Sequence, residues 1–245
     1  MPTPVSPQLA WRPSGQPLAR TALDGTAARL EPLDPAVHAD QLYAASHGPG
    51  PDGAPAGGSL WDYMAYGPFA DAAAMGAWVA EKAASTDPLF FAVIDKASGY
   101  AAGMASAMRY DPPNGVIEIG HIWFAPVLQR SRAASEAIFL LQAHAFETLG
   151  MRRLEWKCDA QNAASRRAAD RFGFTFEGLF CQHMVVKGRN RDTAWYALLD
   201  GEWTAVKDIF TRWLAPENFD SDGRQKTALS TLMAGWRSRT AGQTK

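Results

Sequence analysis

The sequence predicts an α/β fold of the α+β kind, in which helices cover a sheet that is antiparallel at first and parallel later. Three strand-like runs follow one another in mid-chain: Leu89–Ile94, Gly99–Tyr110 and Val116–Phe124. Only four or five turn-forming residues separate them, which favours antiparallel hairpins,. After the third run a helical segment leads to a strand at Arg152–Cys158, an order typical of parallel pairing,.

The start of the chain is expected to form an arm, a strand and a helix. Residues 1–26 are rich in proline and lack periodicity, which indicates an N-terminal arm,. A strand is expected at Ala28–Leu33 and a helix at Ala36–Ser46. His47–Ser59 is rich in Gly and Pro, which predicts a loop,.

The main domain is expected to span residues 27–200. Leu60–Met64 is aromatic enough to line a pocket, although core packing is the other use of such residues. Asp71–Ser85 is a helix by composition. The helix that follows Val116–Phe124 has one apolar face, made by Ala134, Ile138, Leu141, Ala145 and Leu149.

The second half of this domain is expected to add one helix and two strands. The helix is Ala163–Phe172, and Gly173 after it suits a C-cap,. The strands are Phe174–Lys187 and Thr193–Leu199, joined by a turn.

Residues 201–245 are expected to form a helical extension, with helices around Trp203–Leu214 and Gln225–Trp236. The extension is too short for an independent domain. We expect it to dock on the main domain or on a partner subunit, as in a homodimer.

Charge and cysteine content limit the classes of partner. The formal net charge is −1, so we expect neither nucleic acid nor a membrane surface as a partner. Residues 129–191 nevertheless contain eleven Lys or Arg and six Asp or Glu, which fits a small polyanion better than a polymer.

Cys158 and Cys181 lack a metal-type spacing, and we expect buried free thiols, no metal and a cytoplasmic location,. No signal peptide or long apolar run argues for export,.

A strand that ends in a bend and leads into a basic helix start is the strongest local signal. The turn Gln129–Arg132 precedes the helix, whose first backbone N–H groups lack intrahelical partners,. These groups and the helix dipole attract anions, typically a phosphate. The sequence thus predicts that a phosphorylated ligand lies beside Val116–Phe124.

Two motifs in this region together resemble those of the GNAT N-acetyltransferase superfamily. The family's Gln/Arg-x-x-Gly-x-Gly/Ala signature is here Gln129-Arg130-Ser131-Arg132-Ala133-Ala134, followed by Ser135. Arg132 stands where the first Gly is usual and could add charge. The second motif, N-x-x-S and then G-F-x-x-E-G, is matched from Asn162 to Gly178. The resemblance is to the ribosomal-protein N-terminal acetyltransferase branch.

The resemblance covers about residues 27–200 and implies a fold and a cofactor. The fold is a central, mixed, V-shaped sheet flanked by helices, here with extra C-terminal helices. The cofactor is acetyl-CoA, bound where two parallel strands splay apart. The resemblance implies that the cofactor is contacted by the turn and by five further residues. The turn residues are Gln129, Arg130, Ser131, Arg132, Ala133, Ala134 and Ser135, and the others are Trp123, Phe124, Asn162, Ser165 and Arg167.

Acetyl transfer to an amine needs a base, and Glu118 resembles the strand carboxylate that many family members use. Strand alternation places Glu118, Gly120, Ile122 and Phe124 on one face,. His121, on the other face, is the alternative base, since histidine titrates near neutral pH.

Transfer also needs an acid for the departing thiolate. The Ser of N-x-x-S is a candidate acid in the ribosomal-protein branch, which makes Ser165 the first choice. No Tyr occupies the turn where other relatives place one. Cys181 and His183 are alternatives.

The sequence therefore predicts an acetyl-CoA-dependent N-acetyltransferase. The acceptor is expected to be a primary amine, either a protein N-terminus or a small molecule. The alternative is a GNAT-fold sensor or structural subunit that binds acyl-CoA without turnover. A Ser/His hydrolase is disfavoured, because no G-x-S-x-G elbow is present,.

Overall fold

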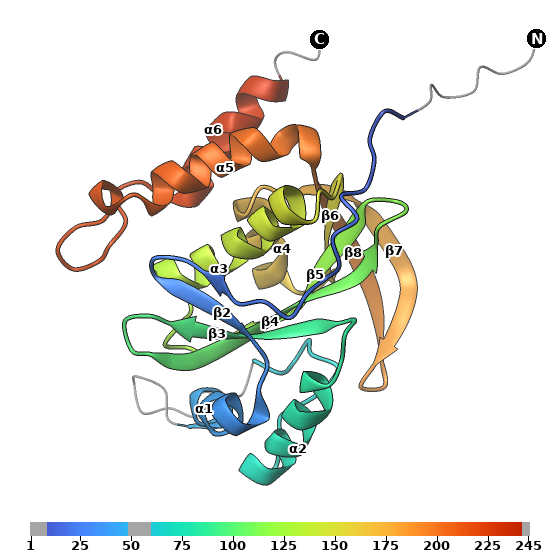
Figure 1. Ribbon diagram of the computed structural model, residues 1–245, viewed down its shortest axis with the longest axis vertical. Helices are drawn as coiled ribbons and strands as arrows, with labels where there is room; N and C mark the ends of the chain where they lie inside the picture. Colours follow the sequence, from blue (N-terminus) through green and yellow to red (C-terminus); the bar gives the residue numbers. More distant parts are fainter. Residues whose placement is uncertain (1–8, 49–59, 242–245) are drawn as a thin grey trace, which may run out of the picture.

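A computed structural model describes residues 9–48 and 60–241, and within them eight strands form one sheet (Figure 1). The strand order is β1-β2-β3-β4-β5-β6-β8-β7. The strands are β1 (Leu23–Asp24), β2 (Ala28–Pro32), β3 (Leu89–Asp95), β4 (Tyr100–Asp111), β5 (Val116–Phe124), β6 (Arg153–Asp159), β7 (Thr175–Val186) and β8 (Arg189–Leu199). The loop predicted at His47–Ser59 lies outside the described residues from residue 49 onwards.

The parallel pair β5–β6 gives the sheet its V shape. All other neighbouring strands pair antiparallel. β5 and β6 pair only from Val116 opposite Arg153 to Glu118 opposite Glu155. Both strands continue beyond this point, so they diverge, and the predicted mixed, V-shaped sheet is confirmed.

A β-bulge interrupts β5 just after the last paired residues. Gly120 lies opposite Ser106 and Trp123 opposite Met104, so β5 carries one residue more than β4 between these pairs. His121 has a φ of 51°. An inserted residue shifts the alternation of faces. The predicted face shared by Glu118, Gly120, Ile122 and Phe124 is therefore wrong beyond Gly120.

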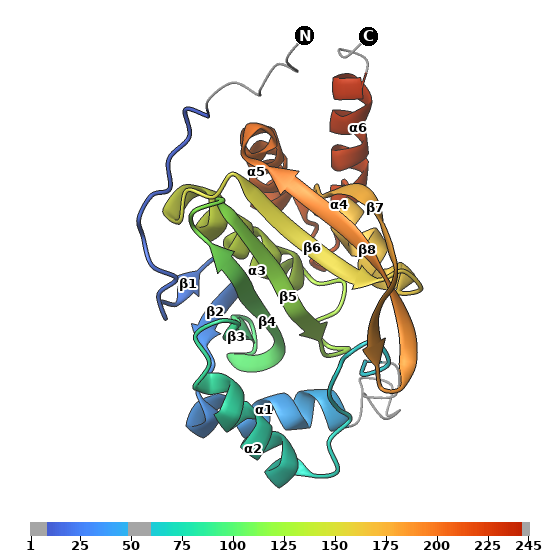
Figure 2. The ribbon, with the colours of Figure 1, turned by 90° about the vertical axis from the view of Figure 1, so that its right-hand side faces the viewer.

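Helices cover both faces of the sheet, with α1 and α2 on one side and α3 and α4 on the other (Figures 1 and 2). Their bounds are α1 (Pro35–His47), α2 (Ala72–Ala83), α3 (Arg132–Ala143), α4 (Ala163–Arg171), α5 (Asp200–Leu214) and α6 (Leu229–Ala241). The helix predicted to continue to Leu149 changes into a π-helix at His144–Thr148, and α6 begins four residues after the predicted Gln225. Both faces of the central strands are thus buried, and the core is one contiguous apolar cluster.

The described part of the N-terminal arm packs along the domain. The Trp11 indole donates to the Gly150 carbonyl at 3.1 Å, and the Ser14 hydroxyl donates to the Leu149 carbonyl at 2.6 Å. The sequence missed strand β1, because two residues are too few to show periodicity.

The C-terminal extension packs on the helical layer over α3 and α4. Phe139 of α3 stacks on Phe210 of α5 with ring centroids 5.1 Å apart, and Phe146 stacks on Trp203 at 5.2 Å. The helices α5 and α6 therefore form an outer layer on the side opposite α1 and α2 (Figure 1).

Gly173 has a φ of 93° and acts as the left-handed residue that ends α4, as predicted,.

None of the helices in the described residues is both long and apolar enough to cross a bilayer.

β7 is one of the two edge strands, and most of its residues are exposed. Cys158 in β6 is buried as predicted, whereas Cys181 in β7 is exposed. The prediction of burial for Cys181 was wrong because an apolar run at a sheet edge has a neighbouring strand on one side only.

Candidate active site

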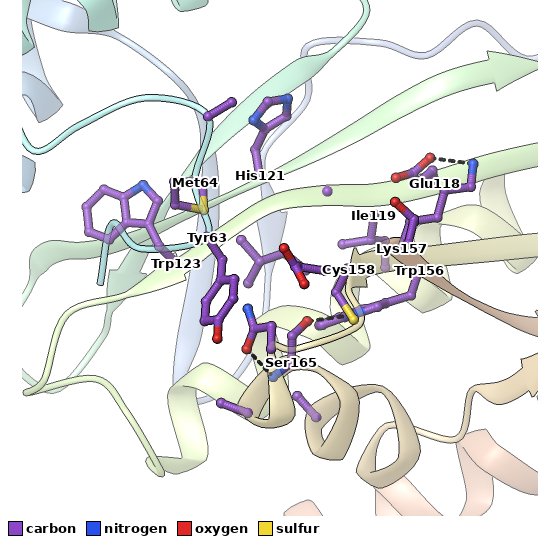
Figure 3. Close-up of a pocket in the computed structure, with 18 of the residues that line it drawn as sticks. Tyr63, Met64, Glu118, Ile119, His121, Trp123, Trp156, Lys157, Cys158 and Ser165 are labelled. Atoms are coloured by element: carbon purple, nitrogen blue, oxygen red, sulfur yellow. Dashed lines mark hydrogen bonds and ion pairs between the residues drawn. The ribbon is translucent and has the colours of Figure 1, made fainter. Parts of the chain in front are cut away.

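A cavity of about 580 Å³ opens where β5 and β6 separate (Figure 3). It is lined by residues of segment 60–65, β4, β5, β6, α4, β7 and β8. The predicted residues Glu118, Trp123, Asn162 and Ser165 all lie on its wall. The structure thus brings together groups that are up to 47 residues apart in the chain.

Glu118 is 5% exposed and lies at the point of divergence, held by two cations. Its Oε2 accepts from Lys157 Nζ at 2.8 Å and lies 3.4 Å from Arg109. Its Oε1 has no hydrogen-bond partner among the described residues. Lys157 also bonds Glu155 at 2.6 Å and lies 3.9 Å from the centre of the Trp195 ring. One carboxylate oxygen is therefore engaged and the other is available to a ligand or water.

The ion pairs continue from Lys157 along β6 to the sheet edge. Glu155 also accepts from Arg153 at 2.7 Å, and Arg153 bonds Glu177 of β7 at 2.5 Å. The bond from Arg153 lowers the pKa of Glu177, and the two carboxylates raise the pKa of Arg153. Sequence reasoning missed this network, although Arg153, Glu155 and Lys157 alternate and so share a face of the strand.

Ser165 lies in the first turn of α4, which Asn162 caps by accepting from the Ser165 backbone N–H at 2.9 Å. The Trp156 indole N–H donates to Ser165 Oγ at 3.0 Å. An indole nitrogen only donates, so the hydroxyl proton of Ser165 can be given to another group. Burial raises the pKa of the neighbouring Cys158 thiol, and the contact with Ser165 opposes this shift.

His121 is poorly suited to act as a base. Burial, with Lys82 and Arg109 adding to the effect, lowers its pKa to about 4. The ring packs against Phe90 and Tyr66 at centroid distances of 4.9 and 5.7 Å. Figure 3 shows it pointing away from Ser165.

Of the two alternative acids, only His183 lines the cavity. Its Nδ1 is 2.9 Å from the hydroxyl of Thr193. Cys181 is exposed and does not line the cavity.

The predicted phosphate turn caps α3. Ser131 Oγ accepts from the Ala134 N–H at 3.0 Å, and Gln129 donates to the Phe124 carbonyl at 2.9 Å. The backbone N–H groups of Arg132 and Ala133 have no acceptor among the described residues. These donors fit a phosphate, as expected at a helix N-terminus.

The side chain of Arg132 does not add charge at this turn, contrary to expectation. Its guanidinium donates to the Leu214 carbonyl and lies 4.8 Å from the centre of the Phe219 ring. The group that replaces the usual glycine therefore contacts the C-terminal extension.

The arginines of α4 differ in position. Arg171 lines the cavity, donates to Ser135 Oγ at 3.3 Å and has its pKa lowered by burial. Arg167 is exposed and outside the cavity wall. Arg166 donates to the Tyr196 hydroxyl at 3.1 Å.

The aromatic segment 60–65 closes one side of the cavity. The Tyr63 hydroxyl donates to the Gln161 carbonyl at 3.2 Å and points towards the start of α4 (Figure 3). Lys187, just after β7, holds the segment by donating to the carbonyls of Trp61 at 2.9 Å and Gly67 at 2.6 Å. Both predicted uses occur, because Tyr63 lines the cavity while Trp61 is buried.

Across residues 9–48 and 60–241, no group of three or more His, Cys, Asp or Glu side chains is arranged to hold a metal ion.

Comparisons with known proteins agree with this architecture. A family model described as the acetyltransferase (GNAT) domain matches residues 30–175, more than half of the chain. A GCN5-related N-acetyltransferase from Brucella melitensis is 50% identical, with a TM-score of 0.85 over 92% of this chain and 99% of that chain. A probable GNAT-family acetyltransferase from Chromobacterium violaceum is 44% identical, with a TM-score of 0.73 over 82% of this chain and 98% of that chain.

Among curated proteins, the uncharacterized N-acetyltransferase p20 of Bacillus licheniformis is similar to part of the chain. The two are 30% identical over 117 residues, which are 46% of this chain and 63% of p20. The chain thus spans less than two thirds of the length of this curated relative. From the family match, the near full-length structural similarity and the splayed sheet, the chain belongs to the GNAT acetyltransferase family.

Proposed function

We propose that the protein is an N-acetyltransferase that transfers the acetyl group of acetyl-CoA directly to a primary amine. The observation that carries this proposal is the short pairing of β5 with β6, which ends at Glu118 and Glu155. Beyond it, the edge of β5 from Ile119 to Phe124 faces the cavity instead of a neighbouring strand. Its backbone groups can bind the amides of the pantetheine arm.

The residues present fit acetyl-CoA. The unpaired N–H groups at the start of α3 and the exposed Arg130 suit the pyrophosphate,. The backbone of Trp123 and Phe124 suits the pantetheine arm. Arg171 adds a partly buried positive charge without a carboxylate partner among the described residues, and Arg167 is the more exposed candidate for the 3′-phosphate.

The cofactor supplies an activated acetyl thioester, and the chain supplies the proton transfers. A bond forms between the amine nitrogen and the acetyl carbon, and the carbon–sulfur bond breaks. Glu118 Oε1 accepts the amine proton, directly or through water, because Oε2 is engaged by Lys157,. Ser165 Oγ donates its proton to the departing thiolate, while Trp156 fixes the position of the oxygen.

The non-catalytic alternative has one observation in its favour. Lys157 and Arg109 both lie against Glu118, so the carboxylate could serve to neutralise buried charge. The two readings agree on acetyl-CoA binding and differ only in turnover.

Binding and turnover are therefore tested separately. The full chain is titrated with acetyl-CoA by calorimetry and thermal shift. Release of free thiol is then followed with amine panels that include amino acids, polyamines and peptides with free N-termini, and products are checked by mass. We expect a thermal shift, thiol release and a product heavier by one acetyl group.

Binding without thiol release from any amine would favour the sensor or structural subunit. The absence of acetyl-CoA binding would contradict both readings.

A further inference from the structure

Arg191 differs from the other basic side chains of the cavity because it has no partner among the described residues. It lines the cavity, and its Nε is buried without a hydrogen-bond partner. By contrast, Lys157 and Arg109 pair with Glu118, and Arg171 donates to a serine hydroxyl. A buried, unpaired donor costs free energy, so a partner from outside the chain is favoured.

Asp192, next to Arg191 in the chain, and Asp159, opposite Thr193, each accept hydrogen bonds at one carboxylate oxygen. Asp192 accepts from the Gln182 backbone at 2.7 Å and from Asn190 at 3.0 Å. Asp159 accepts from the Gln161 backbone at 2.8 Å. The Nε of Arg191 has no hydrogen-bond partner, so neither carboxylate accepts from it.

Strand β8 places Arg191 on the wall of the cavity. Arg191, Thr193 and Trp195 alternate along β8 and so share a face. Thr193 lines the cavity, and Trp195 covers Lys157. Thr193 pairs with Asp159 at the end of β6, and the Asp192 carbonyl accepts from the Ala160 N–H at 2.8 Å, so Arg191 lies beside the turn that leads into α4 and Ser165. Arg191 therefore lies near the residue assigned to proton donation.

A guanidinium in this position suits a small oxyanion. Its planar fork matches a carboxylate, with two parallel hydrogen bonds. The start of α3 and Arg171 already offer the donors that fit the cofactor's phosphates, which leaves Arg191 for the other substrate. Since Arg191 and Ser165 line the same cavity, the anion and the amine must belong to the same small region of the acceptor.

We infer that the acceptor is an amine that carries a carboxylate within a few bonds, and that Arg191 binds this carboxylate. The inference rests on the proposed acetyl transfer and names the class of its acceptor. Free amino acids provide such a group through their α-carboxylate. Peptides provide it only through an acidic side chain near the N-terminus.

Matched acceptors test the inference. L-amino acids with small, aromatic, acidic and basic side chains are compared with their carboxamides, which lack only the carboxylate. Tetrapeptide amides with Asp or Asn at the second position form the peptide arm. Thiol release gives kcat and KM, and calorimetry gives the affinity for acetyl-CoA. We expect the carboxylate member of a pair to be the better acceptor.

Arg191→Gln is expected to remove this preference. The KM for the carboxylate member should rise about tenfold or more relative to that of its amide, while acetyl-CoA affinity stays unchanged. Arg191→Lys should retain part of the preference, because charge remains and the fork is lost. Arg189→Gln, at an exposed position of the same strand, is the matched control and should change nothing.

Preference for amino acids over amides supports an α-carboxylate, and preference for Asp over Asn peptides supports a side-chain carboxylate. Equal use of both members of every pair would overturn the inference while leaving acetyl transfer intact. A loss of acetyl-CoA affinity in Arg191→Gln would also overturn it, because Arg191 would then serve the cofactor. If no amine is acetylated, the proposed function fails, and calorimetry of the same pairs with the acetyl-CoA-bound protein still decides whether Arg191 selects carboxylates.

Discussion

Glu118 lies at the mouth of the V between two cations and an open cavity. Lys157 and Arg109 engage one of its oxygens, and the neighbouring Glu155 shares Lys157. This arrangement gives a way to separate a role in proton transfer from a role in buried charge balance.

Glu118→Gln should lower turnover about 100-fold or more at neutral pH, the size expected for loss of a general base. The amide keeps the shape of the side chain but cannot accept the amine proton. Acetyl-CoA affinity should change little. Thiol-release kinetics and calorimetry measure the two quantities.

Glu155→Gln is the matched control. This substitution also removes a carboxylate that pairs with Lys157, and Glu155 does not line the cavity. Unchanged turnover in Glu118→Gln would remove Glu118 as the base. Equal losses in both variants would assign the effect to the ion pairs.

At the level of elements, the start of α3 is the part that the cofactor proposal depends on most. Ala134 is 3% exposed, and its N–H is taken by the Ser131 cap. Ala134→Glu should abolish acetyl-CoA binding, because it adds bulk and negative charge next to the unpaired N–H groups. Calorimetry measures the binding, and circular dichroism checks the fold.

A second variant protects this test against simple misfolding. Arg130 is exposed, so Arg130→Glu reverses a charge at the turn without disturbing the core. Its acetyl-CoA affinity should fall, whereas Arg189→Glu should retain affinity. Normal affinity in both Ala134→Glu and Arg130→Glu would show that the phosphate turn lies elsewhere.

The elements predicted well are those with strong local periodicity. Strand β5, helix α3 and the caps at Asn162 and Gly173 follow from apolar spacing and cap chemistry,. The bulge at His121 was not predictable, because it depends on how β4 pairs with β5,. The direction of Arg132 was missed for a similar reason, since its partners are about 80 residues further along the chain.

The candidate site was partly predictable. Glu118 and Ser165, which the family resemblance singled out, line the cavity, and their proposed roles remain predictions. Tyr63 belongs to the aromatic segment that was predicted to line a pocket, whereas Lys157 belongs to no motif and reaches the cavity only through tertiary packing.

For the whole molecule, buried and partly buried histidines link stability to pH. Burial lowers the pKa values of His47 and His144. For His121 the pKa falls from 6.5, the ordinary value for histidine, to about 4 in the folded protein. Between these two values the unfolded chain binds a proton that the folded chain does not. The free energy of unfolding should therefore decrease as the pH falls from about 6.5 towards 4,.

His121→Asn should make this decrease shallower, since Asn does not titrate and tolerates a positive φ. Urea unfolding midpoints between pH 7 and pH 5 compare the two slopes. A variant with the same slope as the parent protein would show that His121 does not contribute.

The contact between Arg132 and the C-terminal extension has a thermodynamic consequence. Arg132 is the first residue of α3, and it is held by the Leu214 carbonyl and the Phe219 ring. The proposed phosphate turn and the extension thus share one residue, so a ligand that binds at this turn is expected to be coupled to the docking of the extension, and such coupling is reciprocal. If docking of the extension strengthens ligand binding at the turn, then ligand binding stabilises the docked extension by the same free energy. The family match ends at residue 175, yet the contacts of Arg132 predict that the unit stabilised by a ligand at the turn extends past Leu214.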